Sequence, residues 1–169
     1  MNEVRRLDDV GLLNALVNHS VEFILIGGTA AQLLNLPVPA TVDVDITPLR
    51  TAKNLKRLAK FFDAVHAALM TSEDAGTWFP RIPVENWSQY STLHLLTDFG
   101  LLDIVFEPAG TQNGYMDLLE SSINQELGNS KIRCISEEQW VEMKTSTGRE
   151  KDLEHLGMYF SQRAKKKNP

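Results

Sequence analysis

Apolar residues recur along the chain at two spacings that predict different elements. They fall three or four positions apart over 4–18 and again over 50–70, which predicts two amphipathic helices. The short run VEFILI at 21–26 is apolar and rich in β-branched residues, which predicts a buried strand. The segment TVDVDI at 41–46 instead alternates polar and apolar residues, so it predicts a strand with two chemically different faces.

The rest of the chain alternates between predicted helices and strands. Thr29 is expected to cap a short helix that Pro37 ends, and Ser136 is expected to open a helix that Gly148 breaks. A tight turn at 98–100 predicts a hairpin. Helices are therefore predicted over 29–36, 115–120 and 150–162, and strands over 92–96, 101–106 and 131–135.

This order of elements predicts one α/β (α+β) domain. Because it combines a hairpin with strands separated by helices, the sheet is expected to be mixed, with helices packed against it. A chain of 169 residues fits one domain, which we place at 1–160. Residues 161–169 include Arg163 and three consecutive lysines. They are expected to form a basic, flexible tail with solvated charges, and the alternative is a local patch for nucleic acid.

Composition excludes several classes of protein. The net charge of −5 argues against the broad basic face that a non-specific nucleic-acid coat needs. No stretch approaches the roughly 18 uninterrupted apolar residues of a membrane span, and the N-terminus lacks the apolar segment of a secretory signal. Cys134 is the only cysteine, which excludes a disulfide framework or a multi-cysteine zinc site within one chain. We therefore expect a cytoplasmic protein with no membrane partner.

A pair of carboxylates on the strand at 41–46 is the first candidate for chemistry. Successive side chains of a strand face opposite ways, so Asp43 and Asp45 share one face while Val42, Val44 and Ile46 are expected on the core side. Two carboxylates about 7 Å apart at Cα repel each other unless a cation lies between them. Oxygen ligands favour Mg²⁺ or Mn²⁺, although such a pair on an exposed strand is more often a solvated face.

A glycine pair is the second candidate. Gly27 and Gly28 lie between the predicted strand at 21–26 and a helix start, where backbone comes close to a bound phosphate and the free N–H groups of the helix point at it. Alone, such a pair is more often a structural turn. Together with the carboxylates, it supplies the two parts that hold a nucleoside triphosphate.

These residues resemble a known motif. Gly27-Gly28-Thr29, followed after fourteen residues by Asp43-Val44-Asp45, resembles the first motif of the DNA-polymerase-β-type nucleotidyltransferase superfamily, G-[GS]-x(n)-D-x-[DE]. The resemblance implies the nucleotidyltransferase fold, with a third carboxylate from a later strand. Asp103, within the apolar run LLDIVF, fits that place. Asp43, Asp45 and Asp103 would then be the metal ligands and catalytic carboxylates, with Gly27, Gly28 and Thr29 binding the nucleotide.

A C-terminal stretch adds to the resemblance. KTSTGREKDL at 144–153 looks like the K-x(3)-G-R-x-K-D-L stretch of bacterial nucleotidyltransferase-like proteins related to AbiEii-type toxins and to minimal nucleotidyltransferases. It implies that Lys144, with a catalytic role, and Arg149 reach the triphosphate, and that Lys151 and Asp152 support this site. The alternative is a solvated helix end in which Lys151 and Asp152 pair at the surface.

The resemblance implies a Mg²⁺- or Mn²⁺-dependent enzyme that transfers a nucleotidyl group from a nucleoside triphosphate, ATP among the candidates, to an acceptor hydroxyl. An RNA or tRNA end or a protein would be the acceptor. The likeness to AbiEii-type toxins further implies the toxin of a type IV toxin–antitoxin module, with an antitoxin protein as partner. The alternative is a catalytically inactive binding or regulatory protein with the same fold. That alternative is favoured by Pro39-Ala40, which precede Thr41 where relatives carry a basic residue.

Aromatic residues over 71–91 are a candidate acceptor wall. Trp78, Phe79, Trp87 and Tyr90 would stack bases there, although such residues more often pack a loop onto its domain. His94 is expected one strand away from Asp103, at the rim of the same site.

Overall fold

A computed structural model describes residues 6–70, 78–79, 87 and 89–167 of the protein. The helices are α1 (Asp9–Asn18), α2 (Gly27–Leu33), α3 (Ala52–Ala64), α4 (Tyr115–Leu119), α5 (Glu137–Thr147) and α6 (Glu150–Lys167). The strands are β1 (Phe23–Ile26), β2 (Asp43–Pro48), β3 (Ala68–Met70), β4 (Trp78–Phe79), β5 (Thr92–Thr97), β6 (Gly100–Val105), β7 (Ile123–Leu127) and β8 (Ser130–Cys134).

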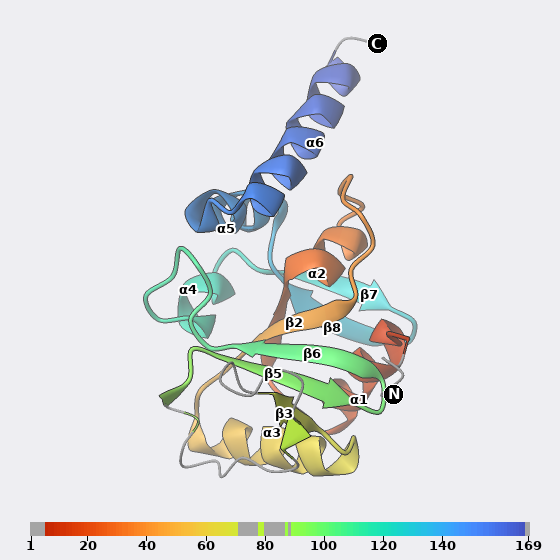
Figure 1. The fold of residues 1–169 in the computed structure, drawn as a ribbon, viewed down its shortest axis with the longest axis vertical. Coiled ribbons are helices and arrows are strands. Elements are labelled where there is room, and N and C mark those ends of the chain that lie inside the picture. The colour runs from red at the N-terminus through yellow and green to blue at the C-terminus, as the bar shows by residue number, and fades with distance from the viewer. Residues whose placement is uncertain (1–5, 71–77, 80–86, 88, 168–169) are drawn as a thin grey trace.

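The strands form one mixed sheet, which confirms the predicted fold class (Figure 1). Its order is β4-β3-β5-β6-β2-β1-β8-β7. Strand β2 pairs in parallel with β6 and antiparallel with β1, while β1 pairs in parallel with β8. The hairpin of β5 and β6 is antiparallel, as the turn at 98–100 predicts. The first motif and the later apolar strand therefore meet at the centre of the sheet.

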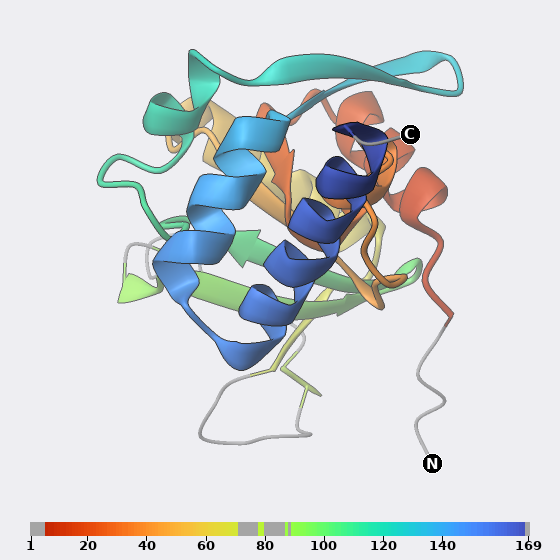
Figure 2. The same cartoon turned by 90° about the horizontal axis from the view of Figure 1, so that it is seen from above.

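Helices bury the apolar side of this sheet. Helix α1 contributes Leu12, Leu13 and Leu16 to the core, and α3 contributes Leu58 and Phe61. Helix α2 packs against β1, β2 and α5. Helices α5 and α6 lie side by side at one end of the molecule, as the view from above shows (Figure 2). None of the described helices is both long and apolar enough to cross a membrane.

Several predicted elements agree with the structure. Helix α5 begins at a capping box, in which the Ser136 side chain accepts from the Gln139 N–H and the Gln139 side chain accepts from the Ser136 N–H. It ends at Gly148 in the left-handed conformation, as the sequence predicts. Strand β8 and helix α4 also lie within a residue of their predicted positions.

The predicted helix over 50–70 is wrong at its C-terminal end. Helix α3 stops at Ala64, the chain turns through His66 with φ of +49°, and residues 68–70 form β3. Pairing of β3 with β5 overrides the helical spacing that continues to Leu69. Strand β7, which the sequence did not predict, pairs antiparallel with β8 at the sheet edge.

Three further boundaries differ from the predictions. Helix α1 begins at Asp9, after Asp8 as its cap, and α6 continues past Gln162 to Lys167 through residues expected in the tail. Helix α2 begins at Gly27 without a side-chain cap, so Thr29 is not its N-cap. Val42 precedes β2 and is 70% exposed, whereas Val44 and Ile46 are buried as expected.

Candidate active site

Strand register brings the candidate carboxylates together. Asp45 of β2 lies directly beside Asp103 of the parallel strand β6, and Asp43 lies two residues before Asp45 on the same face. All three line one cavity of about 560 Å³. The structure therefore places the three predicted carboxylates on one wall.

The carboxylates raise one another's cost of ionisation. Burial, followed by the negative charges of Asp43 and Asp103, raises the pKa of Asp45 to about 7, against the opposing effect of Lys144 and Arg149. Burial also raises the pKa of Asp103, although the hydrogen bond with His94 acts in the other direction. Concentrated negative charge of this kind favours a bound cation.

The donor set fits a hard divalent cation in its chemistry. Carboxylate oxygens on neighbouring strands are typical Mg²⁺ and Mn²⁺ ligands. As the side chains stand, Asp43 Oδ1 accepts a 2.7 Å hydrogen bond from the Thr41 hydroxyl, and Asp103 Oδ1 lies 3.0 Å from His94 Nδ1. Within the described part of the chain, no three acidic, histidine or cysteine side chains already converge as a ligand set. To hold a metal together, the three carboxylates would therefore have to reorient and give up part of their hydrogen bonding to Thr41 and His94.

The glycine pair allows close backbone approach to this wall. Gly27 has φ of +69°, and a Cβ on it would lie 2.2 Å from Asp45 Oδ2. A Cβ on Gly28 would lie 2.8 Å from the Thr41 Cβ. Both glycines line the cavity, so the backbone at the start of α2 contributes to its surface together with the carboxylates. Their role toward a phosphate stays a prediction.

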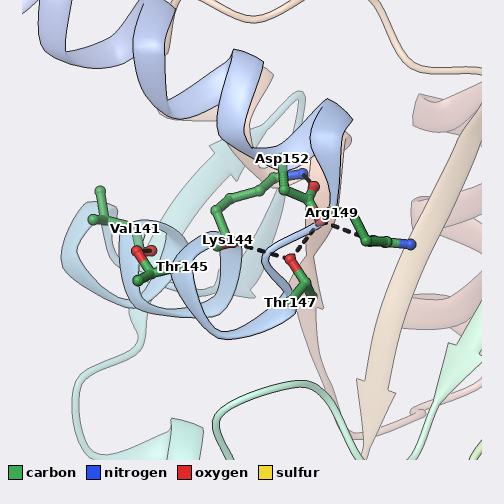
Figure 3. Close-up of polar contacts among 6 residues, drawn as sticks. All are labelled: Val141, Lys144, Thr145, Thr147, Arg149 and Asp152. Atoms are coloured by element: carbon green, nitrogen blue, oxygen red, sulfur yellow. Dashed lines mark hydrogen bonds and ion pairs between the residues drawn. The ribbon is translucent and has the colours of Figure 1, made fainter.

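A cationic cluster at the junction of α5 and α6 lines the same cavity. Figure 3 shows its polar contacts. Asp152 is buried there, with Lys144 Nζ 2.6 Å from its Oδ1 and Arg149 Nε 2.8 Å from its Oδ2. The Thr147 hydroxyl also donates to Asp152. Burial favours the neutral acid, but the hydrogen bonds from Lys144, Thr147 and Arg149 outweigh it and lower the pKa of Asp152 to about 2.

These contacts differ from the alternative considered for residues 144–153, a solvated helix end with a surface pair. Asp152 pairs with Lys144 and Arg149 inside the fold, so the expected surface pair of Asp152 with Lys151 is not what forms. The Arg149 side chain is 73% exposed and keeps most of its surface free, whereas the Lys144 side chain is 15% exposed. Lys151 also lines the cavity.

Thr29 is the predicted residue that does not reach the cavity wall. It is buried, and its hydroxyl donates a 3.1 Å hydrogen bond to the Asp43 carbonyl. Its side chain therefore fixes β2 against α2, and only its backbone remains for the expected nucleotide contact.

Sequence reasoning missed other residues of the cavity. Thr41 and Thr147 each hold a carboxylate, and His155 and Trp140 line the wall around Lys144. Thr41 lies inside the T-x-D-x-D pattern, which is the one sequence signal for it. Burial, with the charges of Lys144 and Lys151, lowers the pKa of His155. Helical spacing is the sequence signal for it, since His155 follows Lys151 by four residues and shares its face of the helix.

The expected acceptor wall falls largely outside the described residues. For Trp78 and Phe79 only the backbone is described, as β4. Trp87 is buried, with its ring centroid 5.2 Å from that of Phe62, which favours the packing alternative for this residue. Tyr90 is half-exposed and does not line the cavity. His94 does line it, one strand from Asp103 as predicted.

Comparisons with known proteins identify the fold. The lincosamide antibiotic adenylyltransferase LnuA, solved with lincomycin bound, matches with a TM-score of 0.61 over 93% of this chain and 99% of its own, at 16% identity. The antibiotic-resistance factor ANT(2'')-Ia matches with a TM-score of 0.56 over 89% of this chain and 80% of its own, at 14% identity.

A Thermotoga maritima protein provisionally assigned as a nucleotidyltransferase gives a TM-score of 0.54 over 90% of this chain and 89% of its own, at 17% identity. No protein-family model matches the sequence, and the comparison with curated proteins finds no match. These likenesses confirm that the chain has the nucleotidyltransferase fold, which the resemblance of its first motif implied.

Proposed function

We propose that the protein is a metal-dependent nucleotidyltransferase, which transfers a nucleotidyl group from a nucleoside triphosphate to an acceptor hydroxyl. One observation carries the proposal. Asp43, Asp45 and Asp103 line one cavity with Lys144 and Arg149, and the Gly27-Gly28 backbone lies at the same cavity. Negative groups that attract a divalent ion and cations that attract phosphate thus share a space of about 560 Å³.

Divalent ions held by Asp43, Asp45 and Asp103 would neutralise the triphosphate and ease ionisation of the acceptor hydroxyl. In the reaction, the acceptor oxygen bonds to the α-phosphorus, and the bond from that phosphorus to the bridging oxygen breaks. Asp103, a carboxylate of the same cavity, takes the hydroxyl proton. Pyrophosphate leaves with its charge stabilised by Lys144 and Arg149, and the Gly27 and Gly28 backbone binds the phosphates closely.

The acceptor stays open among hydroxyl-bearing substrates. One solved structure of the same fold is an adenylyltransferase of lincosamide antibiotics, which supports a small-molecule acceptor as well as the RNA, tRNA or protein expected from the sequence. A toxin role with an antitoxin partner, and a cytoplasmic location, stay predictions.

The second candidate is an inactive binding protein of this fold. Pro39 and Ala40 line the cavity where the resemblance implies a basic residue, and Lys144 and Arg149 already pair with Asp152. Both observations reduce the cationic charge that is free to meet a triphosphate. This candidate predicts that the three carboxylates are dispensable for function.

Incubation with each α-labelled nucleoside triphosphate, Mg²⁺ or Mn²⁺ and total RNA tests transfer, and a parallel reaction contains lincomycin as a small acceptor. The wild type is expected to transfer label to one acceptor class, and Asp43→Asn/Asp45→Asn is expected to transfer none. Asp63→Asn, an exposed carboxylate on α3, is the matched control and is expected to keep activity. Transfer by the double variant at the wild-type rate would contradict the proposal.

A further inference from the structure

Helix α6 carries an apolar stripe that nothing in the described chain covers. At about 100° per residue, Leu153, Gly157, Phe160 and Ala164 fall within an arc of roughly 60°. Leu153 and Phe160 are each 56% exposed, and Gly157 and Ala164 are exposed as well. The side of α6 that packs on the protein is a different one, with Asp152, Leu156 and Tyr159. We call the four exposed residues the α6 stripe.

No contact within the described chain explains the glycine at the centre of the stripe. Gly157 lies in the middle of an 18-residue helix, where glycine is less favourable than alanine. A Cβ built on it meets nothing within 4 Å, so no internal contact requires a missing side chain. Because glycine has no side chain, it leaves room for another chain to come close to the helix backbone.

We propose that the α6 stripe is the interface of a homodimer, in which α6 packs antiparallel against α6 of a second copy. With the two-fold axis between residues 158 and 159, Phe160 lies level with the partner's Gly157. Leu153 lies level with the partner's Ala164. Each large side chain thus faces a small one, and both contacts occur twice because the interface is self-complementary.

The charges of α6 favour a second copy in this direction. The first turns carry Glu150 and Glu154, and the last turn carries Lys165, Lys166 and Lys167. In the antiparallel arrangement Lys165 lies level with the interval between the partner's Glu150 and the partner's Glu154, on the same side of the stripe. A parallel arrangement would instead place like charges together, which is unfavourable. One helix therefore supplies both halves of a matched pair.

The interface leaves the candidate active site open. Lys151 and His155, which line the cavity, lie on α6 roughly opposite the stripe. In Figure 1, α6 extends away from the sheet toward its C-terminal end, so a second copy reaches the stripe without crossing the sheet. Dimerisation through the α6 stripe is independent of the proposed function.

Sedimentation velocity over a concentration series tests the dimer. The wild type is expected to show a monomer–dimer equilibrium, and Phe160→Asp is expected to raise the dimer dissociation constant roughly 30-fold or more, as for a central aromatic. Met158→Asp is the matched control, because Met158 is 46% exposed but lies on another side of the helix. It is expected to leave the dissociation constant within about 3-fold. A wild type that stays monomeric throughout, or equal effects of both variants, would overturn the proposal.

Two further variants separate an interface from a structural role. Gly157→Ala is expected to raise the melting temperature of the monomer, since the new Cβ meets open space, and yet to weaken the dimer because the partner's Phe160 occupies that space. The charge reversals Glu154→Lys and Lys165→Glu are each expected to weaken the dimer, and together to restore it. A dimer indifferent to Gly157→Ala and not restored by the double reversal would show that α6 pairs in another way or not at all.

Discussion

At Asp45 the fold keeps a carboxylate where water solvates it poorly and where two other carboxylates repel it. The resulting pKa of about 7 means that the side chain is largely neutral in acid and charged above neutrality. The cost of that charge is offset in part by Lys144 and Arg149, which line the same cavity. A bound divalent ion would offset the rest, which connects this residue to the proposed chemistry.

The first prediction is that Asp45→Asn stabilises the metal-free protein at alkaline pH. Because the pKa of Asp45 rises from 3.8 to about 7 on folding, the wild type gains from a protonated Asp45 at low pH and loses that gain as pH rises through 7. The difference is at most about 4 kcal/mol at pH 8, and near zero at pH 4. Thermal unfolding with a chelator, at both pH values, measures it.

Asp63→Asn is the control for this comparison, since Asp63 is exposed. Added Mg²⁺ is expected to raise the melting temperature of the wild type at pH 8 and to have little effect on Asp45→Asn. Equal pH dependence in wild type and Asp45→Asn would show that Asp45 ionises normally.

The second prediction concerns Asp152, which is buried between two cations. Asp152→Asn leaves the nearly buried Lys144 ammonium without its counter-charge, so the free energy of unfolding is expected to fall by about 3 kcal/mol at pH 7. Because folding lowers the Asp152 pKa from 3.8 to about 2, this contribution is present above pH 4 and is lost as pH falls to 2. Urea unfolding at pH 7 and pH 2.5 gives both values.

Glu142→Gln, at an exposed position of α5, serves as the matched substitution and is expected to change stability by less than about 0.5 kcal/mol. If Asp152→Asn were as mild as this control, the contacts with Lys144 and Arg149 would contribute no net stability.

At the scale of single residues, the sequence predicted the negative half of the site better than the positive half. Asp43, Asp45 and Asp103 follow from strand alternation and from the motif, because a strand fixes which way its side chains face. The ion pair between Asp152 and Lys144 depends instead on the angle between helices α5 and α6 after Gly148. Spacing along the chain does not encode that angle.

Among the elements, the junction of β1 and α2 has the tightest steric demands of the site. The chain passes Gly27 with φ of +69° and lies against Asp45. Here a helix starts without a side-chain cap, because the strand runs into it directly. The third prediction follows from this geometry.

Gly27→Ala is expected to destabilise the protein by about 2–3 kcal/mol, since the new Cβ meets both an unfavourable φ and the Asp45 carboxylate. Gly128→Ala, in the turn between β7 and β8, is the control: its φ is +59°, but its Cβ meets nothing within 4 Å. It is expected to cost about 1 kcal/mol, from φ alone. Chemical denaturation of both variants gives the difference in free energy of unfolding. Equal losses of stability would mean that the Asp45 side chain moves away from the new Cβ at no measurable cost.

The two errors in predicting elements have different physical origins. The 3.6-residue spacing continues past Ala64 to Leu69, but hydrogen bonds to β5 make residues 68–70 a strand. Strand β7 has the short sequence INQEL at a sheet edge, where alternation is weak because neither face is fully buried. The partner of β3 is distant in sequence, so the local pattern cannot reveal it. The partner of β7 is the adjacent strand β8, joined by the turn Gly128-Asn129, so there the turn was the local signal and the weak alternation hid the strand. The helix α5, whose cap and end are local, was predicted closely.

At the scale of the whole molecule, the candidate site and the proposed dimer interface occupy different sides of α6. The first turn of this helix brings Asp152 to the cavity, while the stripe around Gly157 and Phe160 faces away from it. Helix α6 would therefore carry both the proposed dimer interface and Asp152, which pairs with the cations of the site. The mixed sheet itself was predictable from the order of elements, whereas the exposed stripe was visible only once the packed side of α6 was known.

The central claim is that the carboxylate cavity binds a nucleoside triphosphate together with a divalent metal. Isothermal titration of a non-hydrolysable nucleoside triphosphate into the wild type, Asp103→Asn and the control Asp63→Asn, each with Mg²⁺ and with a chelator, tests it most directly. The wild type and Asp63→Asn are expected to bind the nucleotide when Mg²⁺ is present and not when the chelator is. Asp103→Asn is expected to weaken that binding at least about 10-fold. No binding to the wild type, or binding indifferent to both metal and Asp103, would contradict it.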